Sequence, residues 1–179
     1  MEIRFLGNSL SDEIKEDFWK IVCLMDNDFV PPLSSRESSY QKGFSKEKAD
    51  NKVLPVKYFE ALCEQQFILA TVDGKTAGFL SYKTHYTCDA LGEINDSLYI
   101  TTICILPEMR NRGISKRLYE EAESVIAPEE GYDYVTTRTW STNEAQMHLL
   151  PLRGYDKVAV LKDDRGEGID TVYFAKKIR

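Results

Sequence analysis

The sequence predicts a mixed α/β (α+β) domain, in which a central, mostly antiparallel sheet is flanked by helices. The first observation behind this prediction is a pair of apolar runs at 66–86, which Asp73-Gly74 separates as in a tight hairpin. The second is an apolar, β-branched run at 98–106, followed by an amphipathic helical pattern at 113–126. The third is the expected element order, β-α-α-β-β-β-α-β-α-β-β, which lacks the strict alternation of a fully parallel sheet.

Length and composition predict one domain over residues 1–179. The chain has 179 residues, of which 42% are hydrophobic, and a formal net charge of −6. These values are ordinary for a globular protein with a substantial core. No run approaches the roughly 18 apolar residues of a membrane span, and the first residues form neither a hydrophobic signal segment nor a basic leader. We therefore expect a cytoplasmic protein that binds no membrane.

Charge is distributed unevenly along the chain. Residues 1–97 contain 11 Lys and Arg against 16 Asp and Glu, whereas residues 98–179 contain 12 against 13. An acidic total disfavours broad nucleic-acid binding and mildly favours cationic small partners. Nucleic acid is therefore not an expected partner.

Cysteine and histidine usage argues against the common metal centres. The four cysteines have no C-x-x-C spacing, so neither a zinc site nor a disulfide framework is indicated, and two histidines are too few for a multi-histidine centre. We expect reduced, mostly buried thiols and no metal. The residues concerned are Cys23, Cys63, Cys88, Cys104, His85 and His148.

The first elements are expected on the acidic half of the chain. Residues 2–7 fit an edge strand, and residues 11–29 fit a helix with apolar side chains at helical spacing behind a Ser11 or Asp12 cap. Residues 30–52 break this periodicity and are rich in Pro, Ser and Lys. They predict an ordered loop with room for one helical turn.

The middle of the chain predicts a helix and then three strands. Residues 55–65 fit a helix with Pro55 in its first turn. The hairpin over 66–86 follows, then a connection over 87–97. The strand at 98–106 is apolar on both faces, which is typical of a central strand, and Pro107 ends it.

The last third predicts helix, strand, helix and hairpin. We expect a strand at 132–140, a helix at 143–154 closed by Gly154, and a hairpin over 156–178. The preceding helix over 113–126 is expected to bury one stripe and to point three glutamates outward. The stripe is Ile114, Leu118, Ala122, Val125 and Ile126, and the glutamates are Glu120, Glu121 and Glu123.

Four cations lie around a glycine where the strand at 98–106 leads into the helix at 113–126. They are Arg110, Arg112, Lys116 and Arg117, around Gly113. Free amides at a helix start favour phosphate oxygens, and glycine permits close approach of the backbone. Cations at this end oppose the helix dipole unless an anion offsets them. The alternative is a solvated helix face, on which Lys116 and Arg117 pair with glutamates four residues on.

The residues from Ile103 to Glu123 carry a resemblance to a known family. The stretch ICILPEMRNRGISKRLYEEAE is similar to the acetyl coenzyme A signature of the GNAT superfamily of N-acetyltransferases, in which an Arg/Gln-x-x-Gly-x-Gly/Ala loop links a strand to a helix. Here the pattern is Arg110-x-x-Gly113-x-Ser115. Neither the nucleotide-hydrolase loop nor a dinucleotide-binding G-x-G-x-x-G is present.

A second stretch, STNEAQMHLLPLRGYDKV, resembles the later part of the same pattern. Asn143 and Gly154-Tyr155 fall in register with it. Many members carry a tyrosine on this helix that protonates the departing thiolate, but Leu150 occupies that position here. Together the two matches cover residues 98–175.

The resemblance implies a GNAT-like fold in which 1–97 forms the acceptor side and 98–179 binds the coenzyme. It implies that loop amides and cations hold the pyrophosphate, that a main-chain N–H near the middle of the central strand serves as an oxyanion hole, and that an amine attacks the thioester directly. The coenzyme-binding residues so implied are Ile103, Cys104, Ile105, Arg110, Asn111, Arg112, Gly113, Ile114, Ser115, Lys116 and Asn143.

Candidate catalytic residues each have a structural alternative. Glu93, with Asp96 second, is a candidate base for the acceptor amine, or else a solvated loop carboxylate. His148 is a candidate acid, or else a helix histidine packed beside the core. A mid-strand apolar setting raises a thiol pKa, which argues against Cys104 as a nucleophile.

The acceptor is expected to bind the first third of the chain. Two acidic residues and four aromatic ones either shape an amine-binding cleft or anchor the loop. They are Asp26, Asp28, Tyr40, Phe44, Tyr58 and Phe59.

The function predicted is therefore an acetyl coenzyme A-dependent N-acetyltransferase, with acetyl coenzyme A as cosubstrate and a small-molecule or peptide amine as acceptor. The alternative is a non-catalytic coenzyme A-binding or regulatory module with the same fold. The oligomeric state stays open, with a homodimer among the options.

Overall fold

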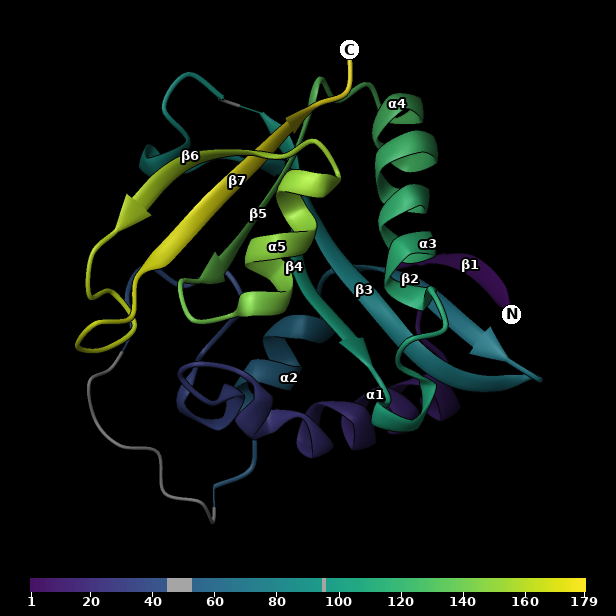
Figure 1. Ribbon diagram of the computed structural model, residues 1–179. Coiled ribbons are helices and arrows are strands. Elements are labelled where there is room, and N and C mark those ends of the chain that lie inside the picture. Colours follow the sequence, from purple (N-terminus) through teal and green to yellow (C-terminus); the bar gives the residue numbers. More distant parts are fainter. Residues whose placement is uncertain (45–52, 95) are drawn as a thin grey trace.

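The computed structural model describes residues 1–44, 53–94 and 96–179, and these form one seven-stranded sheet with helices on both faces (Figure 1). The strand order is β1-β2-β3-β4-β5-β7-β6. All neighbours are antiparallel except β4 and β5, which are parallel, so the predicted mixed, mostly antiparallel sheet is confirmed. The strands are β1 Glu2–Gly7, β2 Gln66–Val72, β3 Lys75–Tyr86, β4 Ser97–Ile105, β5 Tyr134–Trp140, β6 Asp156–Leu161 and β7 Thr171–Lys177.

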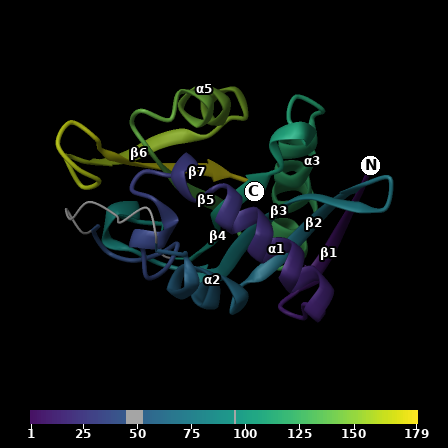
Figure 2. The ribbon, with the colours of Figure 1, turned by 90° about the horizontal axis from the view of Figure 1, so that it is seen from below.

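The helices divide between the two faces of the sheet. Figure 2 shows α1 and α2 on one face and α3 and α5 on the other. The helices are α1 Asp12–Leu24, α2 Val56–Cys63, α3 Ile114–Glu121, a π-helical turn Ala122–Ile126, α4 Ala127–Glu129 and α5 Glu144–Leu152. Short 3₁₀ turns cover Asp26–Asp28, Leu33–Ser35, Asp89–Leu91 and Pro107–Met109. No helix among the residues placed by the structure is long and apolar enough to cross a membrane.

The N-terminal elements follow the sequence pattern closely. Ser11 caps α1 by accepting a hydrogen bond from the Ile14 amide at 3.3 Å, because its side chain satisfies an N–H that has no partner within the helix. The helix ends at Leu24, earlier than predicted, where 3₁₀ geometry begins. The predicted helical turn in the following loop lies at Leu33–Ser35, and the part of that loop at 45–52 is outside the described residues.

The predicted hairpin joins β2 to β3. Asp73 and Gly74 have φ angles of 51° and 75°, the two consecutive left-handed residues that a tight two-residue hairpin requires. Farther along the same pair, the backbone of β3 comes very close to β4. A Cβ added at Gly78 would lie 2.4 Å from the Cys104 carbonyl oxygen, so this position accepts only glycine without a backbone shift.

Two cores flank the central strands. One lies under α1 and α2 and includes Phe18, Phe67, Phe79 and Cys104. The other lies under α3 and α5 and is built from β2, β3, β4 and β5 side chains together with Leu118. Burial on both faces explains why β4 is apolar on both sides, as its sequence predicted.

The parallel pair β4 and β5 separates partway along its length. The paired residues end at Ile100 and Thr137, although β4 continues to Ile105 and β5 to Trp140. On its other side β4 stays paired with β3 as far as Ile105. The backbone of β4 beyond Ile100 therefore has an open edge toward β5.

The prediction that Glu123 points outward is wrong. Its side chain is buried, with a residue exposure of 3%, whereas Val125 from the predicted apolar stripe is 38% exposed. The cause is the π-helical turn at Ala122–Ile126. A π turn holds more residues than an α turn, so it rotates every later side chain relative to a regular 3.6-residue pattern.

All four cysteines are free. Cys104 is buried, and the other three are half-buried. The expectation of mostly buried thiols therefore holds for one cysteine in four. Within 1–44, 53–94 and 96–179, no group of three or more His, Cys, Asp or Glu side chains is placed to hold a metal ion.

Candidate active site

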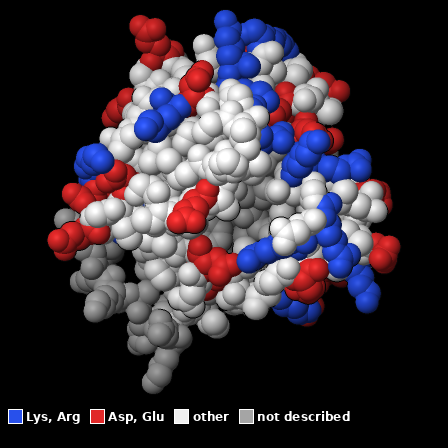
Figure 3. All heavy atoms as spheres, in the orientation of Figure 1, with Lys and Arg blue, Asp and Glu red and all other residues white. Residues whose placement is uncertain are grey.

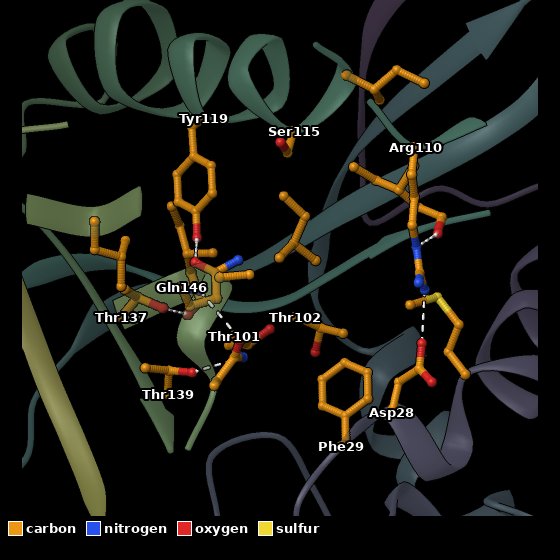
Figure 4. Close-up of a pocket in the computed structure, with 18 of the residues that line it drawn as sticks. Asp28, Phe29, Thr101, Thr102, Arg110, Ser115, Tyr119, Thr137, Thr139 and Gln146 are labelled. Carbon is orange, nitrogen blue, oxygen red and sulfur yellow. Dashed lines mark hydrogen bonds and ion pairs between the residues drawn. The ribbon is translucent and has the colours of Figure 1, made fainter. Parts of the chain in front are cut away.

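A cavity of about 440 Å³ opens where β4 and β5 separate (Figure 4). Its walls come from the ends of both strands, the first turns of α3 and α5, and the turn after α1. The volume lies within the usual range of small-molecule sites, roughly 300–1,000 Å³. Figure 3 shows that this face of the molecule is hollowed near its centre, with basic side chains gathered toward the side where α3 lies.

The loop before α3 has the backbone geometry of an anion site. Asn111 and Gly113 have φ angles of 61° and 74°, and Gly113 is the N-cap of α3 without any side-chain hydrogen bond to the first turn. The first amides of a helix lack intrahelical partners, so these N–H groups are left to an external acceptor. Together with the helix dipole, they favour a phosphate at this rim of the cavity.

The four cations of this loop have different environments. Arg110 donates to Asp28 at 2.7 Å, and Lys116 lies 3.7 Å from Glu120, as the helix-face alternative predicted. Arg112 and Arg117 are exposed and have no ion-pair partner among the described residues. The helix-face alternative therefore holds for Lys116 and not for Arg117, and the phosphate interpretation stays a prediction.

The structure brings most of the predicted coenzyme residues to one cavity. Those that line it are Ile103, Ile105, Arg110, Asn111, Gly113, Ile114, Ser115 and Asn143. Those outside its lining are Cys104, Arg112 and Lys116. Cys104 packs into the core on the opposite face of β4, and burial raises the pKa of its thiol to about 12. A thiol held neutral and away from the cavity is unsuited to act as a nucleophile.

Asn143 has a structural role as well as a place at the cavity. Its Oδ1 accepts from the Gln146 amide at 3.2 Å, so it caps α5, and its Nδ2 donates to Thr139 Oγ1 at 3.1 Å. One Nδ2 hydrogen is left over. The side chain is thus fixed in orientation before any ligand arrives.

Tyr119 is a cavity residue that sequence reasoning did not identify. It extends from α3 toward α5, where its hydroxyl donates to Gln146 Oε1 at 3.1 Å (Figure 4). Burial, reinforced by the nearby Glu123 carboxylate, raises the pKa of the phenol, which therefore keeps its proton at neutral pH. The available signal was its spacing from Ser115, since residues four apart share a helix face. Leu150, at the position of the absent family tyrosine, also lines the cavity.

The two predicted catalytic residues, Glu93 and His148, lie outside this cavity. Glu93 and Asp96 line a separate, smaller hollow of about 230 Å³ that also includes Tyr132. His148 is on the exposed side of α5 and does not line the cavity. Their catalytic roles stay predictions that only variants can test. Asp28 is the one acidic residue among the described residues that line the cavity.

The acceptor-side candidates divide between the two roles proposed for them. Asp26 anchors the loop by accepting from the Ser34 amide at 2.6 Å and the Ser34 hydroxyl at 2.9 Å, whereas Asp28 lines the cavity. Tyr58 is buried and bonds Thr102 at 2.6 Å, which places it directly behind the cavity wall. Phe59 packs against Trp19, away from the cavity.

The sequence matches the family model of the acetyltransferase (GNAT) family over residues 33–155. A search of curated proteins finds no match. The fold is similar to that of many solved structures, but the sequence identities are so low that they show a common fold alone.

Three of these structures illustrate the likeness. An aminoglycoside 6'-N-acetyltransferase complexed with coenzyme A has a TM-score of 0.70 and 14% identity, covering 100% of this chain and 98% of the other. A ribosomal-protein-alanine N-acetyltransferase from Brucella melitensis has a TM-score of 0.67 and 14% identity, covering 99% of both chains. A Bacillus anthracis protein in complex with acetyl coenzyme A has a TM-score of 0.55 and 18% identity, covering 64% of this chain and 63% of the other.

Proposed function

Because this chain belongs to the GNAT acetyltransferase family, we propose that it is an N-acetyltransferase, which moves the acetyl group of acetyl coenzyme A onto a primary amine of a small molecule or peptide. The observation that carries the proposal is the cavity between the separated ends of β4 and β5, with the uncapped start of α3 at its rim. The coenzyme supplies an activated thioester. The protein supplies position, polarisation and proton transfer.

The residues present fit such a donor. The amides from Asn111 to Ser115 and the free donors of Arg112 suit the oxygens of a diphosphate. The open edge of β4 offers main-chain groups to the amides of a pantetheine arm, and Asn143 has one spare donor. This division supports the proposal that 98–179 is the coenzyme half, while Asp28 brings the acceptor half to the same cavity.

Acetyl transfer needs a donor to the thioester oxygen as negative charge develops there. A main-chain N–H between Ile103 and Ile105 serves this purpose, because this stretch of β4 has lost its partner in β5. An amine held beside the carbonyl attacks it directly, so that no covalent intermediate with the protein is required. Positioning of the two reactants provides much of the rate.

The attacking amine must first lose a proton, since an alkyl ammonium has a pKa of roughly 10.4. Asp28 is the carboxylate placed to attract the ammonium or to accept its proton through water, and it lies at the cavity edge near Arg110 (Figure 4). Glu93 remains the alternative from the sequence, although it would have to act from a different hollow.

The departing thiolate must gain a proton. Tyr119 is the group we propose for this step, because its neutral hydroxyl lies in the cavity and Gln146 holds its orientation. It would replace the tyrosine that many family members carry at the position of Leu150. His148 remains the alternative acid.

The test is release of coenzyme A thiol from acetyl coenzyme A across a panel of amines, together with a coenzyme A thermal shift. We expect several degrees of stabilisation by coenzyme A in the wild type and none in Gly113→Glu, whose side chain would occupy the anion site. Gly168→Glu is the matched control, since Gly168 has a φ of 73° and is likewise open to solvent. The proposal fails if coenzyme A shifts neither the wild type nor the control.

One observation favours the alternative of a non-catalytic coenzyme A-binding module. Asp28, the one carboxylate among the described lining residues, is already paired with Arg110, so this ion pair competes with any contact to the amine. A coenzyme A thermal shift without thiol release for any amine would support this alternative. We further propose a cytoplasmic location, with neither membrane nor nucleic acid as a partner.

A further inference from the structure

Three arginines gather beside the cavity at the end of the sheet near β5 and β7. Arg36 lies in the loop after α1, Arg138 in β5, and Arg165 in the connection between β6 and β7. All three guanidinium groups surround the ring of Phe44, with their carbons 5.1, 5.3 and 4.4 Å from its centroid. Residues from three distant parts of the sequence therefore form a single cluster of positive charge.

These charges are poorly compensated by the rest of the chain. Among residues 1–44, 53–94 and 96–179, no carboxylate lies within 4.0 Å of any of the three guanidinium nitrogens. Two acidic side chains of the described residues act on the cluster from farther away: Asp164, which reaches Arg165 through Thr171, and Asp26, whose charge raises the pKa of Arg36. Arg36 and Arg165 are only 6% and 7% exposed, and buried cations without partners are costly.

Electrostatics differ among the three arginines: the pKa of Arg138 is raised, because Tyr99 and Tyr173 outweigh its burial, whereas the pKa values of the other two are lowered. Burial, assisted by repulsion from the other guanidinium groups, lowers the pKa of Arg36 to about 10 and that of Arg165 to about 9. Both side chains stay charged at neutral pH. The cluster is thus a site of concentrated positive potential next to the cavity between β4 and β5.

Two orphaned polar atoms lie in this same region. Arg36 Nη2 and Tyr99 Oη are the two buried side-chain atoms that lack a hydrogen-bond partner in the described chain. Burial raises the pKa of Tyr99, and the nearby charges of Arg138 and Arg165 partly offset this increase. Buried polar atoms normally have partners, so two unused donors beside three cations indicate a missing acceptor.

A purely structural role accounts for only part of the arrangement. The three arginines donate to loop carbonyls of Val30, Pro31, Ser39 and Gln41, and so hold the loop after α1 against the sheet. Neutral amide side chains could make such bonds without the cost of three buried charges. Loop anchoring also leaves the two orphaned donors unexplained.

The cluster adjoins the cavity through Arg138, which lies in β5. Arg138 and Trp140 line the cavity, and Arg165 lies 5.6 Å from the Trp140 ring centroid. Arg138 donates through Nη1 to Tyr173 and through Nη2 to two carbonyls, which leaves its Nε–H without a partner among the described residues. Arg138 lines the cavity and the other two arginines do not, so Arg138 is the member of the cluster that an oxyanion in the cavity could reach.

We infer that the cluster of Arg36, Arg138 and Arg165 is the subsite for a compact oxyanion on the acceptor, so that the substrate is a small amine that also bears a carboxylate or phosphate, such as an amino acid. This inference rests on the proposed acetyltransferase function. It makes the acceptor end of the cavity complementary to a zwitterion: Asp28 is the acidic group for the ammonium, and Arg138 is the basic group for the acid.

The activity test uses matched pairs of acceptors: glycine and glycinamide, β-alanine and β-alaninamide, 4-aminobutyrate and 4-aminobutanamide. Thiol release should give kcat/KM at least tenfold higher for the carboxylate of each pair. Arg138→Gln should lose this preference, because the amide cannot balance the carboxylate charge. Arg4→Gln, at an exposed site on β1, should keep it. A preference for the amides, or one unchanged in Arg138→Gln, would overturn the inference.

A binding test separates this inference from the proposed function. In the absence of acetyl coenzyme A, millimolar phosphate or acetate at constant ionic strength should raise the Tm of the wild type and of Arg4→Gln, and less so that of Arg138→Gln. If this shift occurs but no amine supports thiol release, the anion site stands and the acetyltransferase proposal fails. If free anions bind while the acceptor pairs react equally, the cluster serves free anions and its assignment to the acceptor is wrong.

Discussion

Asp28 and Arg110 form an ion pair of 2.7 Å across a sequence separation of 82 residues. The contact joins the turn after α1 to the loop before α3, and so connects the proposed acceptor side to the proposed diphosphate site (Figure 4). Arg110 also donates to the Ile105 carbonyl at 3.4 Å, which fixes the guanidinium at the end of β4. A single arginine therefore faces two competing anions, the carboxylate of Asp28 and any phosphate held by the loop.

The competition predicts opposite effects on the two substrates. Asp28→Asn should tighten coenzyme A binding about two- to fivefold, because a half-exposed pair of this kind contributes up to about 1 kcal/mol. The same variant should raise KM for the amine or lower kcat, because the acidic group at the acceptor side is lost. Isothermal titration and steady-state kinetics measure the two effects.

Asp26→Asn is a suitable comparison, since Asp26 bonds Ser34 and does not line the cavity. It should change coenzyme A affinity by less than twofold. Weaker coenzyme A binding in Asp28→Asn would show that the ion pair organises the loop instead of competing with the ligand.

The proposed acid role of Tyr119 predicts a kcat effect. Tyr119→Phe should lower kcat by about 100-fold, in the range of general acid catalysis, with coenzyme A affinity within about twofold of the wild type. The loss should be smaller for acetyl donors whose thiol has a low pKa, because such a leaving group needs less protonation.

Tyr155→Phe provides a matched control for Tyr119→Phe. Tyr155 is also buried, and its hydroxyl bonds Glu123 at 3.0 Å, outside the cavity lining. It should cost stability without the dependence on the leaving group. Equal kcat losses in the two variants would assign Tyr119 a structural role.

Local patterns in the sequence predicted most of the fold because each depends on a few neighbouring residues. Asp73-Gly74 fixes a hairpin through backbone conformation alone, and Gly113 marks the loop before α3 for the same reason. Glu123 was misplaced, since a π turn is not visible in a periodic pattern. Periodicity assumes a constant number of residues per turn, and one wider turn is enough to reverse a face.

The acceptor side could not be assembled from sequence because its residues come from separate segments. Arg36, Arg138 and Arg165 meet only after the loop after α1 and the β6–β7 connection pack around β5. Asp26 and Asp28 are two residues apart and look equivalent in the sequence. The 3₁₀ turn that contains both directs one to Ser34 and the other to the cavity.

Cys104 should be the least reactive thiol of the folded protein. Burial raises its pKa to about 12, so at pH 8 almost none is thiolate, whereas the other three cysteines are half-buried. Mass spectrometry after iodoacetamide treatment should show labelling of Cys104 only when the protein is unfolded. The folded Cys104→Ala protein should retain thiol-release activity, even where the substitution lowers its stability. Abolished turnover in a folded Cys104→Ala protein would restore a nucleophile role for this residue.

Glu123 should be the most sensitive charged residue for stability. Its buried carboxylate accepts from Arg153 at 3.0 and 3.1 Å, from Lys176 at 2.6 Å and from Tyr155 at 3.0 Å. Glu123→Gln leaves two partly buried cations without an anion and should lower the free energy of unfolding by about 3 kcal/mol, measured by urea denaturation.

Lys176→Met should cost less, because Arg153 still neutralises the carboxylate. Glu120→Gln is the exposed control on the preceding turn; it loses only a surface pair with Lys116 and should change stability by under about 0.5 kcal/mol. A Glu123→Gln protein as stable as this control would mean that the free-energy cost of burying the carboxylate equals the stabilisation that its three partners provide.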